Sequence, residues 1–307
     1  MDCVNQKIGN GYALYCGDTC ELIREIPDES VHCIVYSPPF SSLYTYSNSD
    51  RDLGNSKSDE QFFEHFHFIT TELVRILKPG RIMAVHCMNI PSSKEKDGYI
   101  GLKDFRGELI REFQSVGFIY HGEVAIWKDP VTQMQRTKAL GLLHKQIKKD
   151  SCMSRMGLPD YVIIMRKAGE NAEPVTHTNE TYPVSEWQQV ASPIWDYEFS
   201  PIWWDINQSD TLNVRAARDG RDERHICPLQ LPVIERILNL YTNPNDIVFT
   251  PFAGIGSEVY QAVKMGRRAF GFELKETYWK AACDNMESLN EEKNQMSIFD
   301  FIGGQDE

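Results

Sequence analysis

The residues of this sequence that could do chemistry are gathered in two short motifs. The first is Ser37-Pro38-Pro39-Phe40, which directly follows the apolar run Cys33-Ile34-Val35-Tyr36. A short β-branched run predicts a buried strand, and two prolines cannot continue a sheet ladder, so the strand must end in a stiff corner. Such a corner presents carbonyl oxygens, a hydroxyl and an aromatic ring. Together these groups could hold a flat, amine-bearing ring, although an ordinary turn at a strand end shows the same pattern.

The second motif is glycine-rich and lies far downstream, at Thr250-Pro251-Phe252-Ala253-Gly254-Ile255-Gly256-Ser257. It separates a predicted strand from a predicted helix, so Gly254 and Gly256 would let the backbone approach a ligand at a helix N-terminus. The next predicted strand ends at Glu273, where an acid can accept hydrogen bonds from both hydroxyls of a ribose. A third glycine is missing from the phosphate-binding pattern. This departure favours a nucleoside cofactor without a pyrophosphate.

Strands and helices alternate along the chain, and this alternation predicts an α/β protein with a parallel sheet. The strand at 161–165 is expected to pair with the one at 118–127. Residues 290–307 are predicted to form a loose acidic tail. The predicted strands are 12–16, 31–36, 81–86, 118–127, 161–165, 246–249 and 268–272, and the predicted helices are 20–26 (capped by Thr19), 59–76, 104–116, 232–241, 258–265 and 277–289.

The composition limits the class of protein. A chain of 307 residues can bury a real core, and no apolar run is long enough to span a bilayer. The N-terminus begins no signal peptide and the eight cysteines are scattered without a C-x-x-C pair, so we expect a cytoplasmic, membrane-free protein with reduced thiols and no metal. The net charge of −12 argues against binding to nucleic acid through bulk charge, but it leaves room for a local basic face.

A local basic face is predicted between residues 128 and 156, where seven lysines and arginines meet two aspartates. Each of these cations could contact a DNA phosphate; a solvated helix face is the alternative. The tryptophans between 187 and 204 could line a region that recognises a target, but we expect most of them to belong to a core. The candidate DNA-binding residues are Arg136, Lys138, Lys145, Lys148, Lys149 and Arg155.

Taken together, the two motifs resemble those of the DNA amino-methyltransferases, which use S-adenosylmethionine to methylate adenine N6 or cytosine N4. The tetrapeptide precedes the glycine-rich loop, which is the circularly permuted order of the β class of that family. Two further segments are similar: Gly17-Asp18 matches the acidic contact to the cofactor's adenine, and 223–236 matches the segment and helix before the cofactor loop. The resemblance covers about residues 10–128, 159–167 and 222–289. Thr250 replaces the common Asp and Leu231 the common Lys, which leaves open how the methionine end of the cofactor is held.

The resemblance implies a Rossmann-like methyltransferase fold, circularly permuted, whose sheet is mostly parallel with an antiparallel strand and carries target-recognition insertions. It divides the chain into a catalytic half (1–127), a basic insert (128–158), a returning core strand (159–167), a target-recognition region (168–221), a cofactor-binding half (222–289) and the tail (290–307).

The resemblance also implies roles for individual residues. Ser37, Pro38, Pro39 and Phe40 would be catalytic, and His86 and His225 are expected to be structural, because this chemistry needs no histidine. The cofactor would be S-adenosylmethionine and the main partner double-stranded DNA, with a cognate restriction endonuclease as a further partner and a monomer or homodimer as the assembly. The residues expected to bind the cofactor are Asp18, Ser37, Thr250, Phe252, Ala253, Gly254, Gly256 and Glu273.

The predicted function is therefore site-specific methylation of a flipped-out cytosine at N4, in a bacterial or phage protein. Ser at the first position of the tetrapeptide favours cytosine among relatives, while methylation of adenine N6 is the alternative with the same mechanism. An RNA methyltransferase and a catalytically dead DNA-binding regulator are the less favoured readings. The intact tetrapeptide, Gly254, Gly256 and Glu273 argue against the dead scaffold.

Overall fold

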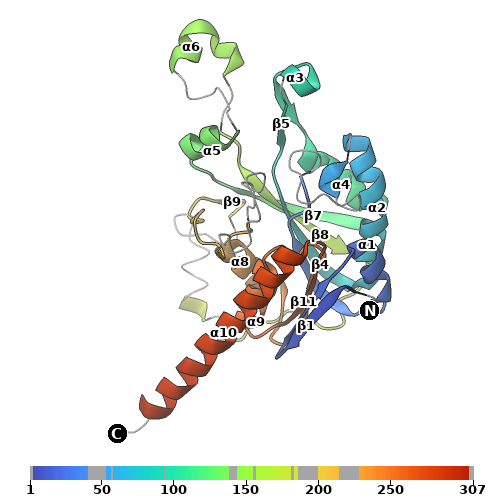
Figure 1. Ribbon diagram of the computed structural model, residues 1–307, viewed down its shortest axis with the longest axis vertical. Helices are drawn as coiled ribbons and strands as arrows, with labels where there is room; N and C mark the ends of the chain where they lie inside the picture. The colour runs from blue at the N-terminus through green and yellow to red at the C-terminus, as the bar shows by residue number, and fades with distance from the viewer. Residues whose placement is uncertain are drawn as a thin grey trace.

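The computed structural model describes residues 3–40, 53–56, 58–92, 94–137, 144–154, 157–180, 183–185, 200–213 and 228–303. Its central feature is a twisted sheet with helices on both faces (Figure 1). In the described part of the chain the sheet has nine strands, in the order β1-β2-β11-β10-β3-β4-β8-β7-β9. These strands are β1 (Asn5–Gly9), β2 (Tyr12–Cys16), β3 (Val31–Tyr36), β4 (Leu77–Cys87), β7 (Phe118–Ile126), β8 (Asp160–Lys167), β9 (Ile202–Trp203), β10 (Ile247–Thr250) and β11 (Arg268–Glu273).

The sheet is mostly parallel, as the sequence predicts. Strands β2, β11, β10, β3 and β4 run in one direction. Strand β8 is antiparallel to both of its neighbours, β4 and β7, so β7 and its parallel partner β9 again run with the main group. Strand β1, which the sequence analysis missed, adds a second antiparallel strand at the far edge. The predicted pairing of the strand at 161–165 with the strand before the basic insert is confirmed.

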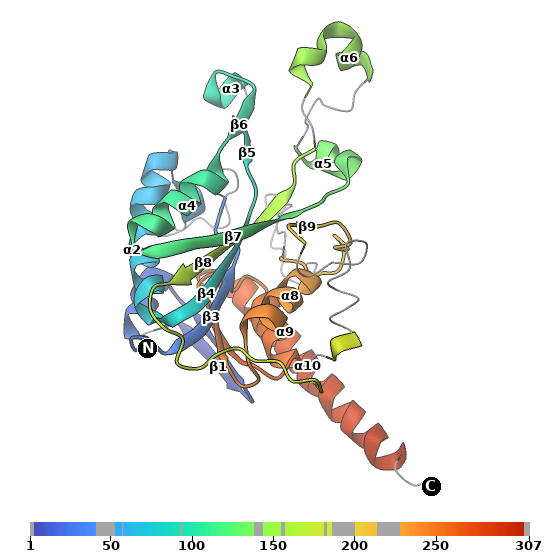
Figure 2. The same ribbon diagram turned by 180° about the vertical axis from the view of Figure 1, so that it is seen from behind.

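The circular permutation is visible in the strand order. Strands β10 and β11 come from the end of the chain, yet they lie between β2 and β3 from its beginning. Two α-helical layers cover the sheet, with α2 and α4 on one side and α8 and α9 on the other (Figure 2). The α-helices are α1 (Thr19–Leu22), α2 (Asp59–Ile76), α3 (Lys94–Asp97), α4 (Phe105–Ser115), α5 (Pro130–Thr137), α6 (His144–Asp150), α8 (Leu231–Tyr241), α9 (Ser257–Lys264) and α10 (Glu276–Gly303).

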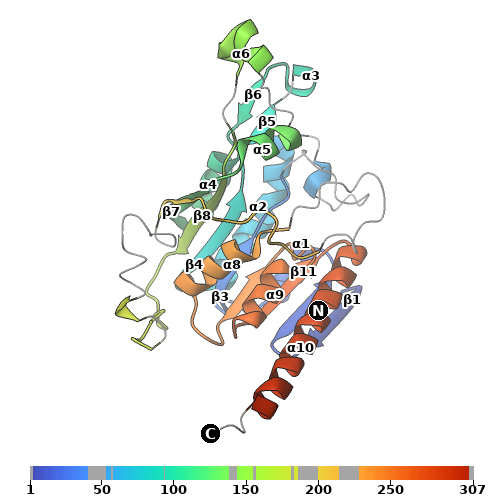
Figure 3. The ribbon, with the colours of Figure 1, turned by 90° about the vertical axis from the view of Figure 1, so that its left-hand side faces the viewer.

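Alternation of side chains along β3 shows how the sheet separates two cores. Cys33 and Val35 face the core under α8, α9 and α10, which Figure 3 shows together on one face. Ile34 and Tyr36 face the second core, under α1, α2 and α4. All of β3 is buried, as expected for a central strand of a parallel sheet covered on both faces.

Several predicted boundaries are wrong at the ends of elements. Asp18, not Thr19, caps α1, because the carboxylate of Asp18 accepts the Cys20 N–H at 2.9 Å; the helix then tightens into a 3-10 turn, Ile23–Glu25. Strand β4 begins directly after α2, at Leu77, four residues before the predicted start of the strand at 81. The predicted loose tail is also wrong, since α10 continues as a helix to Gly303.

Two insertions leave the sheet at the edge formed by the carboxyl ends of its parallel strands. Strand β4 is followed by a hairpin, β5 (Ile90–Ser92) and β6 (Gly101–Lys103), with α3 at its tip. Strand β7 is followed by α5 and α6. These are the outermost elements at the upper end of Figures 1 and 2. The ends of β2, β11, β10 and β3 lie at the same edge, so the insertions extend from the edge that carries both sequence motifs.

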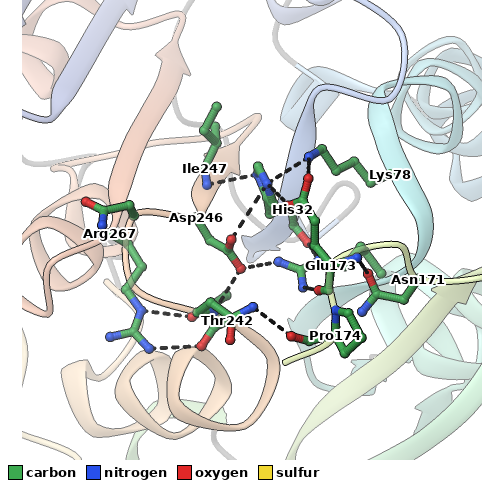
Figure 4. A network of polar contacts seen from close by, with 12 residues as sticks. His32, Lys78, Asn171, Glu173, Pro174, Thr242, Asp246, Ile247 and Arg267 are labelled. Carbon is green, nitrogen blue, oxygen red and sulfur yellow. Dashed lines mark hydrogen bonds and ion pairs between the residues drawn. The ribbon is translucent and has the colours of Figure 1, made fainter. Parts of the chain in front are cut away.

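The opposite edge of the sheet is closed by a polar network (Figure 4). Arg81 is 1% exposed and forms an ion pair with Asp246, while its Nε and Nη1 donate to the carbonyl oxygens of His32 and Glu173 at 3.1 and 3.0 Å. The network joins β3, β4, the start of β10 and the segment around Glu173. This segment belongs to the region 168–221, so the beginning of that region lies at the edge away from the two motifs. Among the described residues, no helix combines the length and hydrophobicity needed to cross a bilayer.

Candidate active site

The topology brings the two sequence motifs together. Strands β10 and β3 are adjacent and parallel. Thr250 ends β10 and Ser37 directly follows β3, so both lie at the carboxyl ends of neighbouring strands. Strands β11 and β2 continue the row, and the N–H of Gly17 donates to the Glu273 carbonyl at 2.9 Å. Ligands of open α/β sheets bind at the carboxyl ends of their strands. The predicted catalytic and cofactor-binding residues therefore share the edge where such a site belongs.

Ser37 is held by a chain of buried polar groups that crosses the sheet. Its Oγ lies 2.8 Å from Nδ1 of His86, whose Nε2 lies 2.9 Å from Oδ2 of Asp160. Lys128 forms an ion pair with the same carboxylate oxygen. The four residues sit on or just beyond β3, β4, β8 and β7, which are neighbours in that order. We call this row of Ser37, His86, Asp160 and Lys128 the polar row.

The charge of Asp160 assigns the protons in the polar row. Burial tends to raise the pKa of Asp160, but Lys128 and His86 outweigh it and lower the pKa below its ordinary value. A carboxylate can only accept hydrogen bonds, so Nε2 of His86 must carry a proton. In the neutral imidazole Nδ1 is then an acceptor, and the Ser37 hydroxyl donates to it. The lone pairs of Ser37 Oγ remain as acceptors.

The glycine-rich turn has the backbone that its sequence predicts. Gly254 and Gly256 have φ angles of +52° and +87°, which other residues rarely adopt. A Cβ on Gly256 would lie 3.0 Å from the Cβ of Ala282 in α10, whereas a Cβ on Gly254 would meet open space. Gly256 thus fits the turn against α10, and Gly254 leaves room in front of it. The turn ends at the N-terminus of α9, where the first N–H groups of a helix have no partner within the helix.

Glu273 is positioned beside this turn. Its Oε2 accepts the N–H of Gly254 at 2.7 Å and its Oε1 accepts the N–H of Lys275 at 2.8 Å. A carboxylate offers about four lone-pair sites, so these two bonds fix its orientation and leave acceptor capacity for hydroxyl groups. The predicted contact with a ribose stays a prediction, and the geometry is compatible with it.

The hydroxyls around the turn fit a polar cofactor. Thr250 and Ser257 are 1% and 2% exposed, and neither hydroxyl has a hydrogen-bond partner in the described part of the chain. Buried polar groups are normally paired, so these two hydroxyls have hydrogen-bonding capacity left for a bound group or water. Thr250 is the residue that departs from the family's Asp. Its unpaired hydroxyl shows that the position remains polar.

Three other predicted residues have roles in the packing of this edge. Asp18 caps α1, as described above, and the neighbouring Thr19 hydroxyl donates to the Pro251 carbonyl at 2.6 Å, which ties α1 to the glycine-rich turn. Phe252 packs against Tyr36, with ring centroids 5.8 Å apart. Ala253 is buried, and its N–H donates to the Phe272 carbonyl at 2.8 Å. Their contacts with the cofactor stay predictions.

Phe40 is half-buried at the end of the tetrapeptide. Its ring lies edge-on to Phe105 of α4, with centroids 6.2 Å apart. This aromatic contact supports the ring from the side of α4. The stacking of Phe40 on a base stays a prediction.

The basic residues of the insert separate into different environments. Lys145, Lys148 and Lys149 are exposed on α6, beyond the edge that carries the motifs. Arg136 lies on α5, while Lys138 and Arg155 fall outside the described residues. Lys128, which opens the basic insert, is 9% exposed and belongs to the polar row instead. The tryptophans also differ in exposure: Trp203 belongs to the core and Trp204 is exposed. Trp187 and Trp195 lie outside the described residues, as does His225.

Three residues beside the predicted site residues were not predicted from the sequence. His86 was expected to be structural, and Asp160 and Lys128 were given no role of their own. Each lies at the end or beginning of a strand on the edge that carries the motifs. Each also lies two residues from a core residue of its strand: His86 from Ala84, Asp160 from Val162 and Lys128 from Ile126. A polar residue at the spacing of the buried side chains could therefore have indicated these positions. Only the strand order brings the three beside Ser37.

Comparison with known proteins assigns the family. The N6_N4_Mtase family of DNA methylases matches residues 31–284. The match spans most of the chain and both motifs, so the chain belongs to this family. Its members are DNA methyltransferases that take their methyl group from S-adenosylmethionine and transfer it to cytosine N4 or adenine N6.

Two curated relatives are similar over nearly the whole chain. The type II methyltransferase M.BglII of Bacillus subtilis is 25% identical over 92% of this chain and 70% of the relative. M.BamHI of Bacillus amyloliquefaciens is 24% identical over 85% of this chain, which spans only 54% of that longer protein.

Two solved structures confirm the fold. The Thermus thermophilus protein TTHA0409, in complex with S-adenosyl-L-methionine, has a TM-score of 0.63 at 22% identity, over 90% of this chain and 93% of its own. PvuII DNA methyltransferase, which is cytosine-N4-specific, has a TM-score of 0.63 at 16% identity, over 93% and 92%. The Rossmann-like methyltransferase fold expected from the sequence is thus confirmed.

Proposed function

We propose that this protein methylates the exocyclic N4 amine of a cytosine at a specific site in double-stranded DNA. The observation that carries the proposal is the position of Ser37. It stands at the end of β3 beside the glycine-rich turn, with its Oγ 2.8 Å from Nδ1 of His86. If the hydroxyl donates to this nitrogen, its lone pairs are available to an amine.

The residues around the glycine-rich turn would hold the cofactor. Glu273 is suited to the ribose hydroxyls, Asp18 to the adenine, and the unpaired hydroxyl of Thr250 to the methionine end. Gly254 would let the ligand approach the backbone, and Gly256 lets the turn pack against α10. S-adenosylmethionine would supply an electrophilic methyl group at its sulfonium.

The tetrapeptide would orient and activate the target amine. The amine's lone pair is delocalised into the base, so the free base is a poor nucleophile. Acceptors at Ser37 Oγ and the Pro38 carbonyl would hold the two N–H groups and favour a tetrahedral nitrogen, while Phe40 would stack on the ring. Positioning of this kind supplies a large part of a transfer rate. The base would have to flip out of the duplex to reach the corner.

The choice of cytosine rests on Ser37. Among relatives, Ser at the first position of the tetrapeptide is more usual with cytosine N4, and Asp or Asn with adenine N6. A Ser37 oxygen that acts as an acceptor suits the amine of either base. Adenine N6 therefore remains the second candidate, and the experiment below separates the two.

Double-stranded DNA is the proposed partner, because two insertions extend from the edge that bears the site. The hairpin with α3 follows β4, and the basic helix α6 follows β7. A cognate restriction endonuclease, a monomeric or homodimeric state and a cytoplasmic location remain predictions from the sequence.

The proposal is tested by nucleoside mass spectrometry of unmethylated DNA after incubation with the protein and S-adenosylmethionine. We expect N4-methylcytosine from the wild type, a loss of at least about a hundredfold in Ser37→Ala, and no change in Ser115→Ala, which alters an exposed serine at the end of α4. N6-methyladenine would keep the mechanism and overturn the base. Absence of any methylated DNA base from the wild type, with the cofactor bound, would contradict the proposal. In that case the same assay on RNA would separate an RNA methyltransferase from a non-catalytic binder.

A further inference from the structure

The polar row has the connectivity of a proton relay. Ser37 Oγ, both ring nitrogens of His86 and the Asp160 carboxylate follow one another at 2.8 and 2.9 Å. A histidine that only supported the fold would need no partner at the catalytic serine. Here both ring nitrogens are committed, one to Ser37 and one to a buried carboxylate.

The charged groups beside His86 come from two neighbouring strands. Asp160 of β8 and Lys128 after β7 are the charged groups that face it in the described residues. On α8, which packs on the same face of the sheet, Arg236 pairs with Asp205 and Glu235 accepts from Gln261. The row therefore holds one negative and one positive charge beside the ring. A proton on Nδ1 would turn the His86–Asp160 contact into a second ion pair.

We propose that His86 is a positioning residue that accepts, through Ser37, the proton which the target amine must lose. This inference rests on the proposed methyl transfer. As the bond from the amine nitrogen to the methyl carbon forms and the bond from sulfur to that carbon breaks, the nitrogen becomes positively charged. One N–H proton passes to Ser37 Oγ while the Ser37 hydroxyl proton passes to His86 Nδ1.

The step is balanced in atoms and charge. The base leaves as a neutral methylated amine, Ser37 ends with a hydroxyl as it began, and the positive charge resides on the imidazolium of His86 beside Asp160. The ring returns its proton to water after the product leaves. Lys128 keeps Asp160 ionised, and Asp160 keeps Nε2 protonated, so that Nδ1 presents its lone pair to Ser37 before the transfer.

The first test is the pH dependence of methyl transfer in a single turnover on duplex DNA. In the wild type we expect the rate to fall at low pH with the loss of one deprotonated group. His86→Asn and His86→Gln keep a polar side chain that cannot take up a proton. We expect both to lower the rate by about 10²-fold or more and to remove this pH dependence, while the dissociation constants for DNA and S-adenosylmethionine change less than about threefold. His121→Asn, which alters an exposed histidine on β7, is the matched control.

Wild-type rates and pH profiles in both His86 variants would overturn the relay. Circular dichroism and thermal unfolding of each variant establish that it is folded; should Asn destabilise the sheet, the Gln variant carries the test.

The second test needs no turnover, so it separates failure of the relay from failure of the proposed function. Nitrogen-15 NMR of the cofactor-free protein reports which ring nitrogen of His86 is protonated, with the resonance assigned by its loss in His86→Asn. We expect a proton on Nε2 and a bare Nδ1 at pH 8, and a shift of the Nδ1 resonance in Ser37→Ala. A proton on Nδ1 would overturn the relay even in an active enzyme. A wild type that transfers no methyl group would instead remove the proposed function on which the relay depends.

Discussion

At the scale of single residues, Glu258 is the least expected group near the site. It is the second residue of α9, directly after the glycine-rich turn, and it is 5% exposed. Burial, with a smaller contribution from the charge of Glu273, raises the pKa of Glu258 to about 8. The carboxyl is therefore mostly protonated at neutral pH. A neutral acid at this position avoids a second negative charge beside Glu273.

This shift predicts how stability depends on pH. The unfolded chain releases the Glu258 proton near pH 4.5 and the folded chain near 8, so Glu258 disfavours the folded state increasingly as pH rises from 4.5 to 8. Glu258→Gln stays neutral throughout. We expect the variant to gain stability relative to the wild type by about 3 kcal/mol between pH 5 and 8. Urea unfolding at both pH values measures the gain, and Glu64→Gln, at an exposed position of α2, is the control. An equal gain at pH 5 and 8 would contradict a buried protonated Glu258.

At the scale of elements, the sequence predicts the central strands and long helices well because their patterns are local. β3 is a continuous apolar run, and α2 carries one apolar stripe from Phe62 to Ile76. The short elements were missed for a physical reason. β9 has two residues and is a strand only because it pairs with β7. Asp18 caps α1 because its backbone is extended and its carboxylate reaches the N–H of Cys20. Ser37 and Glu273 could be named from motifs, whereas the polar row depends on the order of β3, β4, β8 and β7, which no single segment encodes.

In the polar network at the edge away from the two motifs, His32 of β3 contacts both the start of β10 and the segment around Glu173 (Figure 4). His32 Nδ1 accepts the N–H of Ile247 at 3.1 Å, and its Nε2 lies 2.8 Å from Glu173. Protonation of Nδ1 would break the first of these bonds. Burial, together with the nearby cations Lys78 and Arg81 and against the pull of Asp246 and Glu173, lowers the pKa of His32. His32, Glu173 and Asp246 lie close enough together to bind a metal ion. Lys78 and Arg81 pair with Glu173 and Asp246, however, so the positive charge that a metal would supply there is already present.

The lowered pKa predicts acid sensitivity. A histidine whose folded pKa lies below its unfolded value stabilises the fold fully above about pH 6.5, and this contribution is lost as pH falls through the folded value. We expect His32→Asn to be less stable than the wild type at pH 7.5, but to lose less stability between pH 7.5 and 5.5. Urea unfolding midpoints measure both effects, with His121→Asn as the exposed control. A variant that loses as much stability as the wild type over this interval would show that His32 is not the acid-sensitive group.

At the scale of the whole molecule, an acidic protein must bind an acidic polymer. The net charge of −12 repels DNA on average, so attraction has to come from a restricted surface. α6 is the predicted surface of this kind. Lys145, Lys148 and Lys149 are exposed on it, and α6 extends away from the sheet (Figure 1).

Removal of these three lysines should change the salt dependence of DNA binding. If each contacts a phosphate, changing Lys145, Lys148 and Lys149 to Gln reduces the slope of log K against log salt by about 2 to 3. Fluorescence anisotropy with a labelled duplex at several salt concentrations measures the slope. The double change Lys7→Gln and Lys264→Gln removes lysines of β1 and of the last turn of α9 and should leave the slope nearly unchanged. Equal slopes in the wild type and the triple variant would show that α6 is only a solvated helix.

The position of β10 and β11 between β2 and β3 has a consequence for how the chain is made. During synthesis, the first half emerges with β2 and β3 separated by a gap that nothing yet fills. The two strands that complete the sheet are made more than 200 residues after β3. Contacts between such distant parts of a chain form slowly because the intervening chain must first be ordered. Until β10 and β11 have been made, β2 and β3 therefore have unpaired inner edges, and the segment from Ile247 to Glu273 decides when the sheet can close.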